Sequence, residues 1–353
     1  MPETNGNGNT NQSALLYDPL PKRVGVVYSE AKREYFPTEA QFLTEAGAEK
    51  DARVIASYLE KMGMETFLFT GDDTLSENLK AKKPDMVFQL VDSVKGNEYL
   101  SSCIPGLLEL LNIPYTGSDV LGLALCYNKY LVKQLIKAAG IPVPNCQLFL
   151  SANDQLDINL RFPLISKLNE IHGAVEINKD SISESEKALR ERLKFLVSTY
   201  KQPVLVEEFI VGREITALVL EGQNKKVYMA EKKFEKAENK YQIASFDFQW
   251  LDNDPDNSWH YEKYTNDTLK ELVRKAFEAT KMMDYGKFDI RVDDSGRYYF
   301  IDANPNPAFG PKELETALGT ILETMYKIDF KEVLRRLIIN TYKGPIEDYN
   351  GTE

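Results

Sequence analysis

Two aspartates and an asparagine near the end of the sequence are spaced so that they could bind a cation. They lie in FDIRVDDSGRYYFIDANPNP, Phe288 to Pro307, where apolar and polar residues alternate as in half-buried strands. If Ser295-Gly296 is a two-residue hairpin turn, Asp289 lies opposite Asp302. Asn304 projects to the same face as Asp302. Because opposed carboxylates repel, the pattern predicts a hard cation such as Mg²⁺, bound by oxygen ligands and phosphates. A solvated hairpin with incidental acids is the alternative.

Two lysines stand at positions that suit anion binding. Lys129 falls in the first turn of a predicted helix in YNKYLVKQLIKAAG, where a cation opposes the helix dipole unless an anion is nearby. A solvated side chain is the alternative for Lys129. Lys167 closes the apolar strand of FPLISK, so its ammonium could point into a cleft. The sequence has no GxxxxGK[ST] motif and no GxGxxG after a strand, so any ATP must be held in another way.

Composition narrows the function classes. The chain has 353 residues, 43% hydrophobic and 27% charged, which suggests two or three domains with a sizeable core. Its net charge of −11 argues against a partner that is a nucleic acid or an anionic membrane. The sequence shows no long apolar run and no signal-peptide core.

Cysteine and histidine usage points to the cytoplasm and away from zinc. Cys103, Cys126 and Cys146 have no metal-ligand spacing, and a sparse, odd count fits a reducing cytoplasm better than a disulfide framework. With only two histidines, His172 and His260, a zinc site is not expected.

Strands and helices alternate in the first third of the chain. Strands are predicted at Arg23–Ser29, TFLF and DMVFQLV, and helices at Ala46–Met62 and in SSCIPGLLELL. This rhythm over Arg23–Asp119 predicts a small parallel sheet. The opening MPETNGNGNTNQS is polar and predicts a disordered tail.

After Asp119, the sequence predicts further strands and several helices. In the helix that begins near Lys129, an apolar stripe is expected from Leu131, Val132, Leu135, Ile136 and Ala139. Further strands are predicted at Leu164–Lys167, in AVEI, on both sides of Gly212 and in the lysine-rich stretch after them. Helices are predicted at Ser183–Tyr200, Thr268–Met282 and Lys312–Asn340.

Taken in order, Lys129, Lys167, VLVEEFIVGRE, Asp289 and IDANPNP resemble the ATP-grasp fold. Within it, GLLELLNIPYTGSDVLGLALCYNKYLVKQLIKAAGIPVP resembles the D-alanine–D-alanine ligases, and the similarity runs from about Arg23 to Asn340. The resemblance implies an α/β protein with α+β character in its C-terminal half. The disordered tail predicted from composition is assigned to 1–21, and the resemblance implies a parallel-sheet substrate domain at 22–125. A central lid domain at 126–210 and a C-terminal ATP-grasp domain at 211–345, with the Mg²⁺ site, would follow.

The resemblance also implies roles for individual positions. Lys129 and Lys167 match the lysines that hold ATP phosphates, and Glu214 matches the acid that binds the ribose. The linker that reads adenine falls on Glu207, Glu208, Phe209 and Ile210. In it, Glu207 would accept from the adenine amino group. The metal ligands of the family fall on Asp289, Asp302 and Asn304, for Mg²⁺ with Mn²⁺ as the alternative.

The implied reaction joins a carboxylate to an amine. The carboxylate of an amino acid or small acid attacks the γ-phosphate of ATP, and an amine acceptor then attacks the acyl phosphate, giving an amide, ADP and phosphate. Relatives of this kind imply a homodimer. An ATP-binding regulatory module without turnover is the alternative. A phosphohydrolase that uses the acids alone would leave the lysines unexplained.

The sequence departs from the family at the substrate side. His172 stands where a glycine is expected, and Lys287 replaces an arginine two residues before Asp289. Arg291 could substitute for that arginine if it lies on the right face. His172, Lys287 and Arg291 are therefore the candidate catalytic residues.

Two further features of the family cannot be placed in this sequence. A further phosphate-binding lysine is expected among Lys232, Lys233, Lys236 and Lys240. VDSVKGNEY replaces the His-Gly and Gly-Glu segment of the family's first substrate pocket, so ATP handling is expected while the substrates stay open.

Overall fold

The first sheet is built from short apolar strands that run parallel, as the alternation of strands and helices predicts. Its order is β2-β1-β3-β4. The strands are β1 (Arg23–Tyr28), β2 (Glu65–Thr70), β3 (Met86–Leu90) and β4 (Tyr115–Thr116). The computed structural model describes residues 20–221, 225–236, 240–251 and 254–342. Residues 1–19 of the predicted tail therefore lie outside the described residues.

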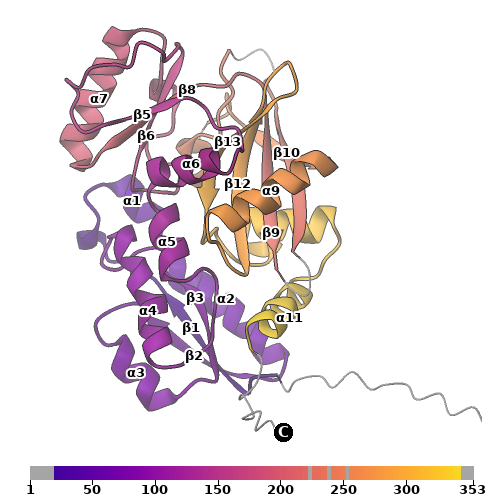
Figure 1. Cartoon of the computed structure of the whole chain (residues 1–353). Helices are drawn as coiled ribbons and strands as arrows, with labels where there is room; N and C mark the ends of the chain where they lie inside the picture. The colour runs from indigo at the N-terminus through magenta and orange to yellow at the C-terminus, as the bar shows by residue number, and fades with distance from the viewer. Residues whose placement is uncertain (1–19, 222–224, 237–239, 252–253, 343–353) are drawn as a thin grey trace, which may run out of the picture.

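Short helices surround this sheet at the indigo end of the chain (Figure 1). They are η1 (Arg33–Tyr35), α1 (Glu39–Leu43), α2 (Ala48–Lys61), α3 (Leu75–Lys82), η2 (Glu98–Ser102), α4 (Cys103–Leu110) and α5 (Val120–Cys126). Helix α2 buries the face predicted for it, with Ala52, Ile55, Ala56 and Leu59 against the sheet. The helix ends just before Gly63, whose φ of +93° suits a residue without a Cβ.

The central sheet is antiparallel and small, with order β5-β8-β6-β7. Its strands are β5 (Cys146–Phe149), β6 (Leu164–Leu168), β7 (Ile182–Ser183) and β8 (Val204–Glu208). After the short η3 (Lys179–Ser181), helix α7 (Glu186–Tyr200) covers the sheet, capped by Ser185. Leu189, Leu193 and Leu196 of α7 are fully buried in a core of this region's own.

The third sheet is antiparallel, with order β11-β10-β9-β12-β13. Its strands are β9 (Arg213–Leu220), β10 (Lys226–Phe234), β11 (Trp259–Tyr264), β12 (Tyr285–Val292) and β13 (Tyr298–Asn304). Helices α6 (Lys129–Ala138) and α9 (Asp267–Ala279) pack on it, while α8 (Phe246–Leu251) precedes β11. Strand β11 and helix α8 were not predicted from the sequence.

The hairpin of β12 and β13 places Asp289 opposite Asp302, as predicted, although the predicted turn is wrong. Asp293 N donates to Arg297 O, which closes a three-residue loop and not a two-residue turn. That loop shifts the ladder by one residue near the turn. A β-bulge next to Asp289 shifts it back, because Ile290 pairs with Phe300 while Asp289 pairs with Asp302.

Two local predictions are wrong. AVEI is a turn and not a strand, with Ala174 and Glu176 at φ of 56° and 65°. The predicted stripe of α6 is also misplaced, since Leu131 is 46% exposed. Val132 and Ile136 are buried as predicted, but Lys129 and Lys133 share their buried side.

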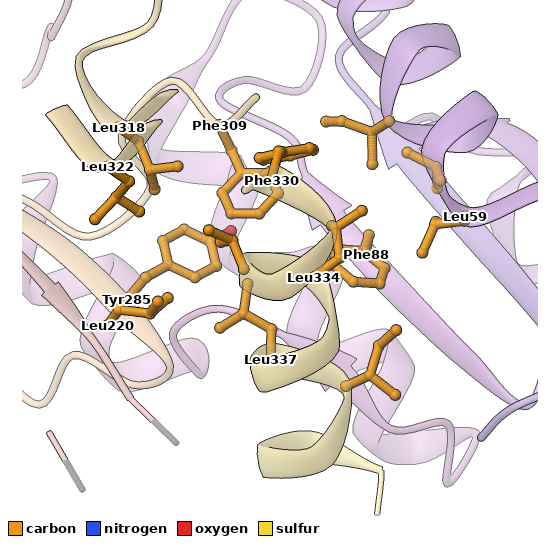
Figure 2. Close-up of a cluster of buried hydrophobic side chains, with 14 of the residues drawn as sticks. Leu59, Phe88, Leu220, Tyr285, Phe309, Leu318, Leu322, Phe330, Leu334 and Leu337 are labelled. Atoms are coloured by element: carbon orange, nitrogen blue, oxygen red, sulfur yellow. The ribbon is translucent and has the colours of Figure 1, made fainter. Parts of the chain in front are cut away.

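The C-terminal part is broken into several helical pieces where one helical stretch was predicted. The pieces are η4 (Lys312–Leu314), α10 (Ala317–Gly319), the π-helical η5 (Thr320–Met325) and α11 (Phe330–Thr341). Figure 2 shows Phe330, Leu334 and Leu337 of α11 near Leu59 and Phe88. The same cluster holds Leu220 and Tyr285 of the third sheet, so these residues form one core. Helix α11 therefore joins the first and third sheets.

Three further observations bear on the sequence analysis. None of the helices in the described part of the chain combines the length and apolar character needed to cross a bilayer. Cys103, Cys126 and Cys146 are all free thiols. The predicted domain boundaries stay a prediction: α6 lies in the predicted central domain, yet its Val132 and Ile136 belong to the core of the third sheet.

Candidate active site

A cavity of about 950 Å³ is lined by residues from all three sheets. Every residue to which the sequence analysis gave a single role in catalysis, nucleotide binding or metal binding lines it. These residues are Lys129, Lys167, His172, Glu207, Glu208, Phe209, Ile210, Glu214, Lys287, Asp289, Arg291, Asp302 and Asn304. Residues separated by up to 175 positions, the difference between 304 and 129, are thus gathered into one site.

Asp289 is held by cationic groups. Its Oδ1 accepts from Thr216 Oγ1 at 2.8 Å and lies 3.3 Å from Lys232 Nζ. Its Oδ2 accepts from Lys287 Nζ at 2.7 Å. Burial alone would raise the pKa of Asp289, but Lys232 and Lys287 outweigh it and hold that pKa well below its usual range. Asp289 is therefore ionised at neutral pH.

Asp302 and Asn304 face the same cavity from β13. Burial would raise the pKa of Asp302, but Lys129 and then His172 lower it. Asn304 Oδ1 accepts from the backbone N–H of Asn306 at 3.0 Å. Across the described ranges, no three His, Cys, Asp or Glu side chains form a metal-ligand group. A cation site here would rest on two carboxylates and one amide.

The two predicted phosphate lysines lie on neighbouring walls. Lys129 Nζ donates to Ile171 O at 2.5 Å from the first turn of α6, whose N-cap is Asn128. Lys167 Nζ donates to Ile301 O at 3.1 Å, next to Asp302. Burial lowers the pKa of Lys129 and lowers that of Lys167 to about 8. Both ammonium groups gain stability from any anion that enters the cavity.

A third lysine, Lys133, was missed in the sequence. Its Nζ lies 2.6 Å from Glu207 Oε1, and Lys167 Nζ lies 2.7 Å from Glu207 Oε2. Glu207 is 1% exposed and Lys133 3%, so this acid and this lysine are buried together, and burial holds the pKa of Lys133 well below its usual range. Lys133 also donates to Ile301 O at 2.9 Å. The available signal was its spacing of four residues from Lys129, which places both on one face of a helix.

Glu214 anchors a second buried network. Its Oε1 lies 2.6 Å from Lys232 Nζ, and its Oε2 lies 2.8 Å from Arg291 Nη2. Burial would raise the pKa of Glu214, but Lys232 and Arg291 lower it. The Arg291 guanidinium stacks 4.9 Å from the Phe209 ring centre. Arg291 thus lies beside the residues matched to adenine and ribose, so the structure does not place it as the replacement for the missing arginine.

Glu208 and His172 contact neighbouring segments. The Glu208 carboxylate accepts from Asn145 Nδ2 and from Arg161 N, both at 3.0 Å. Because its side chain is engaged in this way, a contact from Glu208 to adenine would come from its main chain. His172 Nδ1 lies 2.8 Å from Glu98 Oε2, and the His172 backbone N–H also donates to Glu98. His172 Nε2 has no partner among the residues described.

Of the four lysines considered for a further phosphate contact, Lys232 is the one that lines the cavity. Lys233 lies 2.6 Å from Glu231, and Lys236 pairs with Asp256. Lys240 lies 2.6 Å from Glu184 and is exposed. The structure therefore brings Lys232 into the site.

The end of the cavity near the first sheet is acidic, and the sequence analysis missed it. Glu45, Asp51, Asp92 and Glu98 all line this end. Asp92 follows β3, and the carboxyl ends of parallel strands are where α/β sheets bind ligands, so Asp92 could have been found. The others come from short helices and loops whose positions depend on the tertiary fold.

Comparisons with known proteins agree with this geometry. The family model described as the D-ala D-ala ligase C-terminus matches residues 135–338, more than half of the chain. This chain belongs to that family. A D-alanine–D-alanine ligase of Aquifex aeolicus is 27% identical over 299 residues, 82% of this chain and 94% of that protein. An uncharacterized protein of Sinorhizobium fredii, y4sG, is 29% identical over 265 residues, 72% of this chain and 77% of its own length.

A solved structure shares the fold over most of the chain. The D-alanine–D-alanine ligase of Bacillus anthracis, crystallised with ATP, has a TM-score of 0.66 and 22% identity. The match covers 90% of this chain and 97% of that one. The fold is therefore ATP-grasp with an N-terminal parallel-sheet domain, as the sequence resemblance predicts.

Proposed function

We propose that this chain is an ADP-forming ligase that joins a carboxylate to an amine at the expense of ATP. The observation that carries the proposal is the single cavity in which Lys129, Lys167, Glu214, Asp289 and Asp302 meet. Family membership and the ATP-bound structural neighbour support the use of ATP. A regulatory module without turnover is not favoured, since it would have less need of both carboxylates and the lysines.

The nucleotide would lie across the β6–β8 and β9–β12 walls. Lys129 and Lys167 would bind phosphate oxygens, because burial disfavours their charges until an anion is present. Glu214 would accept from ribose hydroxyls, with Arg291 and Phe209 beside it. The pairing of Glu207 with Lys133 and Lys167 supports a positioning role for this acid beside the phosphate lysine, in addition to the predicted adenine contact.

The donor set fits Mg²⁺, with Mn²⁺ as the alternative. Asp289 and Asp302 face each other across the ladder, and Asn304 adds an amide oxygen on the same wall. When bound, the cation would neutralise charge on the phosphate oxygens during phosphoryl transfer. It would share Asp289 with Lys232 and Lys287, or displace them, since both ammonium groups contact that carboxylate.

The reaction would proceed in two steps. A substrate carboxylate oxygen attacks the γ-phosphorus of ATP, and the bond to the β-phosphate oxygen breaks, releasing ADP. The amine nitrogen then attacks the acyl carbon, loses a proton, and phosphate leaves. Lys287 and Lys232 would balance the charge that develops near Asp289. His172, held through Nδ1 by Glu98, lines the cavity, and its buried Nε2, which has no partner among the described residues, would contact phosphate or substrate.

The test is ADP release from Mg²⁺-ATP with a panel of amino acids and small carboxylates, singly and in pairs with amines. We expect ADP only with particular acid–amine pairs, and an amide product by mass spectrometry. ATP binding without ADP release across the panel would contradict the proposal and favour the regulatory module. Elution volume in size-exclusion chromatography would test the predicted homodimer in the same preparation.

A further inference from the structure

The acidic end of the cavity gathers carboxylates from separate segments of the first domain. Glu45 follows α1, and Asp51 lies in the first turn of α2. Asp92 follows β3, and Glu98 begins η2. All four line the same cavity as the proposed nucleotide site, so they face whatever substrate lies next to ATP.

Neutral groups, and not lysines or arginines, hold Glu45 and Asp92. Glu45 Oε2 accepts from Ser93 Oγ at 2.8 Å, and Asp92 Oδ1 accepts from Asn306 Nδ2 at 2.9 Å. Within the part of the chain that the structure describes, the groups that act on the pKa of Glu45 and Asp92 include no lysine or arginine, and for Asp51 they include Lys50 alone. Glu98 contacts His172, which is charged only when protonated.

The carboxylates therefore repel one another, and this repulsion raises their pKa values. Burial raises the pKa of Glu45 to about 7, with repulsion from Glu98 adding to it. Burial raises the pKa of Asp92 well above its usual range, and Glu45 and Glu98 raise it further. A buried carboxylate without a counter-charge is costly and tends to take up a proton, so a cationic ligand would stabilise the ionised acids at this end of the cavity.

A tyrosine hydroxyl at the same end points to a ligand independently of the acids. Tyr127 is 3% exposed, lines the cavity and packs edge-on against His172, with ring centroids 5.0 Å apart. Its hydroxyl has no hydrogen-bond partner among the described residues. Burial raises the pKa of Tyr127, the charges of Asp92 and Glu98 raise it further, and the neighbouring Ser101 hydroxyl lowers it. A buried hydroxyl in that position would be satisfied by a ligand ammonium.

We infer that this end of the cavity binds a substrate with two cationic nitrogens, such as a basic amino acid or a diamine. The inference rests on the proposed ligase function and specifies its substrate class. An amino acid with a neutral side chain brings one ammonium and so offsets one of the four carboxylates. A second cationic nitrogen offsets another, and the Tyr127 oxygen accepts from it.

Calorimetric binding tests the inference with matched pairs of compounds. Lysine is compared with norleucine, in both stereochemistries, and 1,4-diaminobutane with butylamine, in the presence of a non-hydrolysable ATP analogue and Mg²⁺. We expect at least one dication to bind about tenfold or more tightly than its monocationic or neutral-chain counterpart. Equal affinities within every pair would overturn the inference.

Isosteric variants test which carboxylates cause the preference for a dication. Glu45→Gln and Asp92→Asn keep hydrogen bonding to Ser93 and Asn306 while removing charge, so each should weaken the dication about tenfold and leave its counterpart unchanged. Glu49→Gln is the matched control, since Glu49 lies on α2 but is exposed and pairs with Arg53. An equal loss in the control would overturn the inference.

Turnover separates this inference from the proposed function. ADP release with dications, lost in Glu45→Gln, supports both. ADP release only with neutral-chain substrates overturns the inference and keeps the ligase. Tight dication binding without ADP release under any condition supports the subsite and overturns the ligase.

Discussion

The two ends of the cavity balance charge in different ways. Near the second and third sheets, Glu207, Glu214 and Asp289 each have a lysine or arginine nitrogen within 2.6–2.8 Å. Near the first sheet, Glu45 and Asp92 accept from a hydroxyl and an amide. We call the end near the second and third sheets the basic end. Its carboxylates are paired with cationic groups of the protein, so its side chains are in place before ATP binds. The acidic end leaves its charge to be balanced by a ligand, so under our inference it is where we expect substrates to be distinguished.

The largest effect should follow from removing a carboxylate of the proposed metal site. Asp302→Asn is expected to lower the rate of ADP formation by about 10²–10³-fold, since it removes a charge that holds the transferring phosphoryl group. The measurement is steady-state ADP release. Asp294→Asn is the control, because Asp294 is exposed in the loop of the same hairpin. Similar rates in both variants would remove Asp302 from the mechanism.

Breaking the buried pair of the basic end should destabilise the fold. Lys133→Met leaves Glu207 with Lys167 alone, and we expect the free energy of unfolding to fall by about 3 kcal/mol. Urea denaturation measures it. Lys137→Met serves as the control because Lys137 is exposed on the same helix. A loss no larger than that of the control would show that Lys133 does not stabilise Glu207.

The two ends should respond to pH in opposite directions. Lys167, with a pKa lowered to about 8 by burial, loses its charge as pH rises through that value, so ATP affinity should fall by about tenfold per pH unit above it. Glu45, with a pKa raised to about 7, gains a proton as pH falls below 7, so dication binding should weaken there.

Calorimetry at about pH 6, 7.5 and 9 would record both trends. Lys167→Arg should keep ATP affinity at the higher pH, because a guanidinium stays protonated. ATP affinity that falls equally in this variant and the unaltered protein would mean that another group causes the decline.

The smallest expected effect concerns stability at the acidic end. The pKa of Glu45 is higher in the folded chain than its ordinary 4.5, so the folded state holds this proton more tightly and loses stability as pH rises from about 4.5 to 7. Glu45→Gln should therefore stabilise the ligand-free protein by about 1–3 kcal/mol near pH 8, and by little near pH 4.5. Thermal melts at both pH values would measure the difference, and destabilisation at both would contradict it.

The sequence predicted the basic end better than the acidic end, for a physical reason. Asp289 and Asp302 lie on adjacent strands of one hairpin. The alternation of apolar and polar residues was therefore enough to predict that they pair, although the predicted turn type was wrong. Lys133 and Glu207 meet only because α6, packed on the third sheet, brings Lys133 to Glu207 of β8, a contact that no local pattern indicates. The acidic end depends still more on the tertiary fold, since Glu45 and Asp92 come from separate segments of the first domain.

Loop geometry set a second limit on prediction. AVEI has the composition of a strand, yet Ala174 and Glu176 adopt left-handed backbone conformations in the loop beside His172. Such conformations are uncommon for residues with a side chain and are selected by contacts to the rest of the structure. The same loop ties His172 to Glu98 of the first domain, a contact that periodicity does not indicate.

The position of α11 bears on the order in which the chain can fold during synthesis. Phe330, Leu334 and Leu337 of α11 share one hydrophobic cluster with Leu59 and Phe88 of the first domain (Figure 2). The first domain therefore leaves the ribosome long before the helix that completes its core has been translated. Until then, part of its apolar surface stays exposed to water and to other chains. Folding of the earliest segment is thereby tied to completion of the last.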